Sequence, residues 1–186
     1  GILYGQHQRW SDALGAFEEI ERISREMGDT MGALKAIYNR AIIHYRLHDL
    51  DRAEALFREA RRLSDVLGRH SFSAAIWLGF ASVLRERGRV LESLRLYRRV
   101  IHDADAARAN DVAVAHNNVS EIYLLLGRLA KAMMHADLSF RIAKRTENRF
   151  PRCRVLHLGG QLDRQIFRMF SNRPLHRLVN QLAFRG

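Results

Sequence analysis

The sequence repeats with a period of about 40 residues, and this period constrains the fold more than any single residue does. A small residue recurs in each repeat, at Ala13, Ala53, Ser93 and Ala132. Four positions later come Phe17, Phe57, Tyr97 and, less regularly, Ala136. A unit of this length buries its apolar face only against a neighbouring unit, so such units stack. The period therefore predicts a solenoid in which each repeat covers the next.

The segments between the expected turns have apolar residues at helical spacing. We predict helices over residues 31–46, 50–67, 73–87, 90–106, 111–126 and 129–145, with Asp29, Asp49 and Asp111 placed to cap helix N-termini. Turns are predicted five positions before the small residues, at Gln8, His48, Gly88 and Gly127. At the small residues two helices cross closely, and a larger side chain there would overpack the contact. The fold class that follows is all-α, a superhelix of antiparallel helix pairs.

The positive charge is concentrated in the last part of the sequence. Residues 1–148 hold 23 Lys and Arg against 19 Asp and Glu, whereas residues 149–186 hold 8 Arg against one acid. We therefore predict a repeat array over residues 1–148. Residues 149–186 are predicted to be a partial fifth repeat or a capping helix with an Arg-rich tail. Because the pattern begins half a repeat in, at Gly1, we expect the natural N-terminus to be missing and the first repeat to be truncated.

The order of these features resembles the tetratricopeptide repeat. The third unit matches with Trp77, Phe80, Ala81, Leu84, Gly88, Ser93 and Tyr97, and the second and fourth units follow the same order from Asn39 and from Asn117. The resemblance covers residues 1–145 well and 150–165 loosely. Its period exceeds the common one of about 34 residues. It is therefore similar to the long-repeat subclass found in kinesin light chains and bacterial regulators, whose fold is a right-handed superhelix with a concave groove.

The resemblance implies a peptide-binding groove lined by the first helix of each pair. Carried over residue by residue, it comprises Lys35, Tyr38, Asn39, Ile42, Tyr45, Arg46, Leu78, Ser82, Arg85, Asn117, Asn118 and Glu121. Asn39 and Asn118 share one repeat position, and an amide both donates to and accepts from a peptide backbone. We expect that both can become alanine without disturbing the packed faces. Positive charge at Lys35, Arg46 and Arg85 favours an acidic peptide. The alternative is that these are ordinary solvated positions.

Other recognition motifs are incomplete or absent. Tyr38 and Ile42 stand where the carboxylate clamp of the family has Lys and Asn, so chaperone C-termini are not expected to bind. The sequence contains no phosphate-binding loop, zinc-protease helix or nucleophile elbow. His44 and His48 are four residues apart, but no third metal ligand lies near them in the sequence. The cluster of His102, Asp103 and Asp105 is interpreted as a water-facing helix end and not as a metal site. We predict no enzyme activity, metal or cofactor.

The function predicted from the sequence is a cytoplasmic protein-binding or peptide-binding scaffold. The alternative hypothesis is the sensory domain of a larger bacterial signalling or transcription regulator, whose output domain lies outside this sequence. With only Cys153, the chain forms no internal disulfide, and no apolar run approaches the length of a membrane span. Nucleic acid is expected only as a weak, non-specific contact of the Arg-rich tail, where Phe167, Phe170 and Phe184 offer stacking surfaces.

Overall fold

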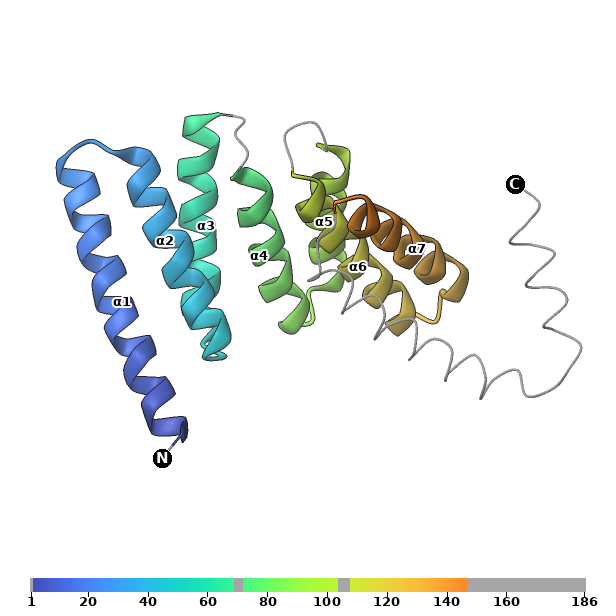
Figure 1. Ribbon diagram of the computed structural model, residues 1–186, viewed down its shortest axis with the longest axis horizontal. Coiled ribbons are helices and arrows are strands. Elements are labelled where there is room, and N and C mark those ends of the chain that lie inside the picture. Colours follow the sequence, from blue (N-terminus) through green and yellow to red (C-terminus); the bar gives the residue numbers. More distant parts are fainter. Residues whose placement is uncertain (1, 69–71, 104–107, 147–186) are drawn as a thin grey trace, which may run out of the picture.

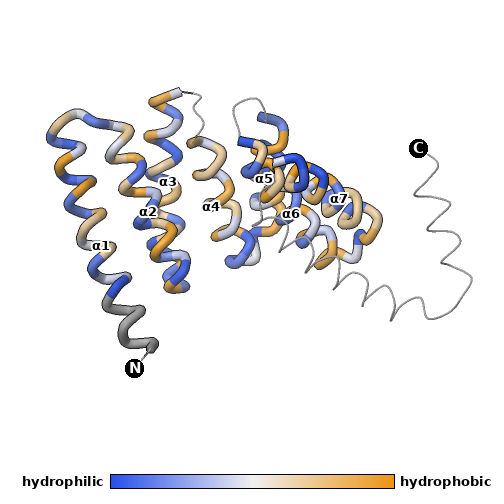
Figure 2. The backbone as a smooth tube through the Cα atoms, in the orientation of Figure 1, coloured by the Kyte–Doolittle hydropathy of each residue, from blue (hydrophilic) through white to orange (hydrophobic). Residues whose placement is uncertain are grey.

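The computed structural model describes residues 2–68, 72–103 and 108–146, with side chains from Arg9 onward. These residues form helices and no strand, and Figure 1 shows successive helices side by side along one array. The helices are α1 (Ile2–Glu26), α2 (Thr30–Arg46), α3 (Leu50–Leu67), α4 (Ser73–Glu86), α5 (Val90–His102), α6 (Ala109–Leu125) and α7 (Leu129–Arg145). The predicted fold class, an all-α solenoid of antiparallel helix pairs, is confirmed. Each helix has hydrophobic and hydrophilic residues interspersed along it, as a helix with one buried face requires (Figure 2).

The helix starts follow the predicted caps at two of three places. Asp29 accepts a hydrogen bond from the backbone N–H of Gly32 at 2.9 Å, and Asp49 accepts one from Arg52 at 3.2 Å. The prediction for Asp111 is wrong, because α6 begins two residues earlier and Asp111 lies buried inside its first turn. Negative charge there still complements the free N–H groups of the helix.

The turns occur at three of the four predicted positions. His48, Gly88 and Gly127 have φ angles of 59°, 76° and 67°, the left-handed conformation that ends a helix. The turn predicted at Gln8 is absent, since α1 continues unbroken for 25 residues. Glutamine is a good helix former and resists the left-handed conformation. The first unit is therefore one long helix, which packs against α2 after a turn at Gly28.

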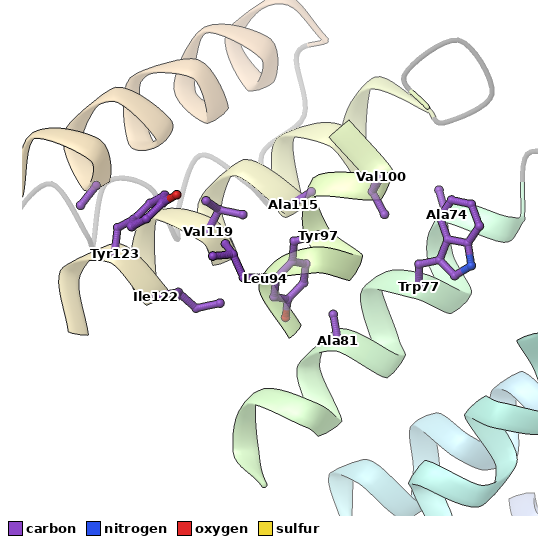
Figure 3. Close-up of a cluster of buried hydrophobic side chains, with 11 residues drawn as sticks. Ala74, Trp77, Ala81, Leu94, Tyr97, Val100, Ala115, Val119, Ile122 and Tyr123 are labelled. Carbon is purple, nitrogen blue, oxygen red and sulfur yellow. The ribbon is translucent and has the colours of Figure 1, made fainter. Parts of the chain in front are cut away.

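Two apolar clusters form the core, and α4 contributes to both. One cluster joins α2, α3 and α4 around Phe57, and the other joins α4 to α7 around Tyr97. Ile76 and Phe80 of α4 belong to the first cluster, whereas Trp77 and Ala81 belong to the second. Figure 3 shows the second cluster, with Tyr97 lying among side chains of α4, α5 and α6. The 14-residue helix α4 thus lies between the two cores, and Leu96 of α5 packs against both.

The recurring small residues are fully buried, as close helix crossings require. Ala53, Ser93 and Ala132 each have 0% exposure. Three buried serines add hydrogen bonds between helices: Ser93 donates to the carbonyl of Ala81 at 2.7 Å, and Ser120 and Ser139 do the same to Ala132 and Ala113. Each serine hydroxyl therefore needs its helix to lie against the backbone of the next.

A pair of histidines packs between α6 and α7. The Nδ1 atoms of His116 and His135 are 2.8 Å apart, so one ring must donate and the other accept. Tyr123 stacks on His135, and Arg98 of α5 donates to the hydroxyl of Tyr123 at 2.6 Å. Burial and the neighbouring His135 lower the pKa of His116 to about 4, and burial together with Arg98 lowers the pKa of His135. Both rings are therefore neutral at pH 7.

The array has an inner and an outer side, defined by which helices touch. Within the described residues, α2 contacts α4 and α4 contacts α6, although another helix lies between each pair in the chain. The intervening helices α3 and α5 make no such contact with each other. The first helices of the pairs are thus closer together than the second helices. We call the surface of α2, α4 and α6 the inner side and that of α3, α5 and α7 the outer side.

Candidate functional site

The predicted groove residues all belong to the three inner helices, but they differ in how far they are exposed. Lys35 and Arg46 are exposed, and Asn117 and Asn118 are buried. The remaining eight residues are half-buried: Tyr38, Asn39, Ile42, Tyr45, Leu78, Ser82, Arg85 and Glu121. The inner side therefore offers a mostly half-buried surface rather than a row of free side chains.

The expectation that Asn39 and Asn118 are equivalent and free is wrong. Asn118 is 3% exposed, whereas Asn39 on α2 is half-buried. The difference arises because α6 is packed on both sides, by α5 and by α7, and also contacts α4. An Asn118→Ala change would alter a packed side chain, so the pair cannot serve as a neutral test of peptide binding.

A chain of polar contacts links neighbouring inner helices. The hydroxyl of Tyr45 on α2 donates to Glu86 Oε1 on α4 at 2.5 Å. Further along, Arg85 Nη1 on α4 donates to Glu121 Oε2 on α6 at 2.8 Å, with exposed side-chain fractions of 23% and 20%. Asn117 Nδ2 donates to the other oxygen of Glu121 at 3.1 Å. These contacts define how Tyr45, Arg85, Asn117 and Glu121 are oriented, which the sequence alone did not predict.

Two atoms of this polar chain have no hydrogen-bond partner. They are Arg85 Nε, a donor, and Asn117 Oδ1, an acceptor, and both are shielded from solvent. Leaving a buried polar atom without a partner costs about 1–3 kcal/mol. Both atoms belong to residues that bind the same carboxylate, Glu121. The inner side thus holds one unused donor and one unused acceptor on the two residues that bind Glu121.

The electrostatics of the inner side differ from the sequence expectation. Arg85 was expected to add free positive charge, but Glu121 neutralises it. Burial by itself lowers the pKa of Arg85, but the neighbouring Tyr97 and Glu121 raise it, and the net shift is upward. Burial and the hydrogen bond to Glu86 raise the pKa of Tyr45 to about 12, so its hydroxyl keeps its proton. The free positive charge on this side comes from Lys35 and Arg46.

Tyr38 and Ser82 are half-buried and contact residues of the core. The ring of Tyr38 packs edge-on against Phe72 at 4.8 Å and against Phe57 at 6.0 Å between centroids. The Ser82 hydroxyl lies 3.0 Å from that of Tyr97. Sequence reasoning missed these contacts and the Tyr45–Glu86 and Arg85–Glu121 pairs. Only the Tyr45–Glu86 and Arg85–Glu121 pairs had a signal in the sequence, because their partners lie about one repeat apart on successive inner helices.

The histidines four residues apart do not converge on one point. His44 Nδ1 lies 3.2 Å from Asp49 Oδ2, whereas His48 Nδ1 lies 3.6 Å from Glu86 Oε2. In the part of the chain that the structure describes, no three His, Cys, Asp or Glu side chains are grouped to hold a metal ion. The described helices also include none long and apolar enough to cross a membrane.

Several predictions concern residues outside the described ranges. They include Asp105 and the whole of residues 149–186, with Cys153 and the Arg-rich tail. The partial fifth repeat or capping helix predicted there remains a prediction from the sequence.

Comparison with known proteins gives similarities in sequence and in backbone. Residues 32–106 match the family model of the tetratricopeptide repeat. The structure resembles BtubC (BKLC) from P. vanneervenii with a TM-score of 0.69 and 18% identity, over 92% of this chain and 68% of that one. It resembles the Rap conjugation gene regulator of plasmid pLS20, in complex with the Phr* peptide, with a TM-score of 0.72 and 15% identity, over 99% of this chain. The chain spans about half of the Rap regulator, 48% of its length. No match is found among curated proteins.

Proposed function

We propose that this chain, whose residues 32–106 match the tetratricopeptide repeat and whose fold is an all-α solenoid, binds an extended segment of a partner protein on its inner side. Solenoids of this kind present extended surfaces for protein interaction and are generally non-enzymatic scaffolds. The Rap regulator, which has the same fold, is in complex with a peptide. That similarity supports a peptide ligand, and the residues of this chain suggest where it binds.

The observation that carries the proposal is the unused donor and acceptor beside Glu121. An extended peptide unit supplies one C=O and one N–H, the groups that Arg85 Nε and Asn117 Oδ1 lack. Both atoms are shielded in the free chain, and Asn117 is 2% exposed, so a segment lying across α4 and α6 reaches them only when the Arg85 side chain, which is 23% exposed, moves aside. Because both atoms are shielded, satisfying them gains more than a bond to a fully solvated group would.

The charges at the edge of this surface favour an acidic segment. Lys35 and Arg46 are exposed on α2, and Arg46 also lies 5.8 Å from the ring of Trp10. Neither residue has an acidic partner within the described residues, so each is available to a carboxylate. We expect acidic residues in the bound segment to lie against α2 and its backbone to lie against α4 and α6.

The test uses peptides selected from a random library on the immobilised chain, with Kd measured by fluorescence polarisation. Arg85→Lys keeps the charge beside Glu121 but removes the Nε donor and the planar fork. It should weaken binding by about 0.5–1.5 kcal/mol, or about two- to tenfold. Arg141→Lys is the matched control, since Arg141 forms an exposed ion pair with Asp137 at 2.8 Å on α7. Equal affinity of both variants and the wild type would refute the proposed binding surface.

The acidic preference has its own control. Lys35→Glu should lower the affinity for the selected acidic peptides severalfold at low salt. The loss of affinity should be smaller at high salt, where the charges are screened. Lys144→Glu makes the same charge change at an exposed position of α7. If the two variants lose affinity equally, the effect is one of net charge and not of a site on α2.

A sensory role in a larger regulator is a second proposal, favoured by the similarity to a gene regulator over 99% of this chain. A sensor must change shape when its ligand binds, whereas a passive scaffold need not. Spin labels on α1 and α7 would report this change as a shift in their distance when a selected peptide is added. An unchanged distance at saturating peptide would argue for the scaffold alone.

A further inference from the structure

A basic pocket lies on the outer side, away from the surface discussed above. It has a volume of about 420 Å³ and lies between α3 and α5, above residues of α4 and Leu96 of α5. The walls consist of charged side chains: Arg58, Arg61, Arg62, Arg89, Glu92 and Arg95. The floor includes Phe80 and Leu84, which are 5% and 2% exposed. Five guanidinium groups thus surround an opening with one carboxylate and an apolar base.

Acidic neighbours compensate only part of this charge. Glu54 accepts from both Arg58 and Arg89 at 2.6 Å, and Glu92 lies 2.7 Å from Arg89. Arg61 is 4.0 Å from Asp65. Arg62 and Arg95 line the pocket from different helices. Together with the hydrogen bond from Arg89, the positive charge of Arg95 lowers the pKa of Glu92, but neither Arg62 nor Arg95 forms a hydrogen bond or a close ion pair with a described residue. Both side chains are exposed, so their donors are available to a ligand.

This arrangement works against the stability of the free chain. Arg58, Arg61 and Arg62 have the spacing i, i+3, i+4, which places three like charges on one face of α3. Like charges at this spacing repel one another, and Arg95 on α5 adds to the same field. A bound anion would remove this repulsion and would use the donors that the protein leaves unpaired.

We propose that the pocket binds a polyphosphate group, either as the free ion or as part of a nucleoside polyphosphate. Guanidinium groups match phosphate oxygens with paired hydrogen bonds, and several converging arginines suit several linked phosphates. The volume lies in the range of small-molecule sites, which favours a small ligand over a nucleic-acid duplex. This site is independent of the peptide surface, because its charged walls belong to α3 and α5 rather than to the inner helices.

Isothermal titration calorimetry of the full chain at 100 mM salt, with sodium tripolyphosphate as the probe, tests the proposal. We expect saturable binding at one site. The double variant Arg62→Gln/Arg95→Gln should raise Kd at least about tenfold, because it removes two charge-assisted contacts. It should leave the melting temperature unchanged or raise it slightly, since it removes exposed like charges that repel one another.

The matched control is Arg9→Gln/Arg128→Gln, which removes the same charge at exposed positions on α1 and before α7. It should leave Kd within about twofold, since at this salt charges beyond about 10 Å are screened. Titrations with ATP and AMP identify the ligand: tighter binding of ATP than of tripolyphosphate indicates a nucleoside polyphosphate, and equal binding indicates the polyphosphate alone. No saturable binding of tripolyphosphate, or equal losses in the two double variants, would overturn the proposal. So would a single-stranded oligonucleotide that binds through Arg62 and Arg95 when tripolyphosphate does not.

Discussion

Replacing Gly79 by alanine tests the close packing of α3 against α4. A Cβ atom at this position would lie 2.4 Å from both Cε1 and Cζ of Phe57, far inside a normal contact. Movement of the ring is restricted, because Phe57 is fully buried, with the ring of Phe80 at 6.4 Å and that of Tyr38 at 6.0 Å between centroids. Either the ring or the helix backbone must shift.

The expected free-energy change is the sum of two opposing effects. Overpacking a core costs about 1–3 kcal/mol. Alanine in place of glycine inside a helix returns about 0.8–1 kcal/mol. Gly79→Ala should therefore destabilise the chain by about 0–2 kcal/mol. Gly15→Ala on α1 is the control, because a Cβ atom there meets nothing within 4 Å. That variant should gain the full helix contribution, so the two changes should differ by about 1–3 kcal/mol.

Urea unfolding followed by circular dichroism measures the free energy of unfolding of both variants. Thermal unfolding offers a second measurement, in which 1 kcal/mol corresponds to about 2–4 °C in melting temperature for a chain of this size. Adding Phe57→Leu should lower the cost of Gly79→Ala by at least about 0.5 kcal/mol, since the two sites are in contact. If Gly79→Ala is as stabilising as Gly15→Ala, the described packing of α4 on Phe57 is wrong.

Three further predictions concern the core, the histidine pair and the tail. Ser93→Ala should destabilise the chain by about 1 kcal/mol in thermal unfolding, because it removes the 2.7 Å hydrogen bond to Ala81; no change would mean that the bond contributes nothing. The unfolded chain binds a proton at His116 near pH 6.5, whereas the folded chain does so only at about 4. Stability should therefore fall by about 1–3 kcal/mol between these pH values, and His116→Gln should reduce that fall. A chain ending at residue 148 should bind heparin more weakly than the full chain, because residues 149–186 carry 8 Arg; undiminished binding would show that residues 1–148 alone account for it.

The sequence predicted the helices well where local signals and packing agree. The bounds of α3 and α7 match the expected ones, because the apolar spacing, the turn residue and the small residue all point to the same register. The turn at Gln8 failed because its position in the period was the only evidence for it. Neither the propensity of glutamine nor a nearby cap supported a break in α1.

The inner side was predicted at the level of helices but not of individual contacts. Repeat positions place Arg85 and Glu121 on the correct helices, yet they do not show that the two side chains bind each other. Nor do they show that Asn118 is buried while Asn39, at the same repeat position, is only half-buried. Such differences depend on which neighbours a helix has, and a period that treats all repeats alike does not contain that information.

The position of α4 between the two apolar clusters has a consequence for how the array unfolds. In a stacked array each unit gains stability only from its immediate neighbours, and separate parts can melt at different temperatures. Here α4 supplies side chains to both clusters, so its loss would expose the Phe57 cluster and the Tyr97 cluster together. The helix therefore couples the melting of the two clusters, so a loss of packing in one should lower the stability of the other.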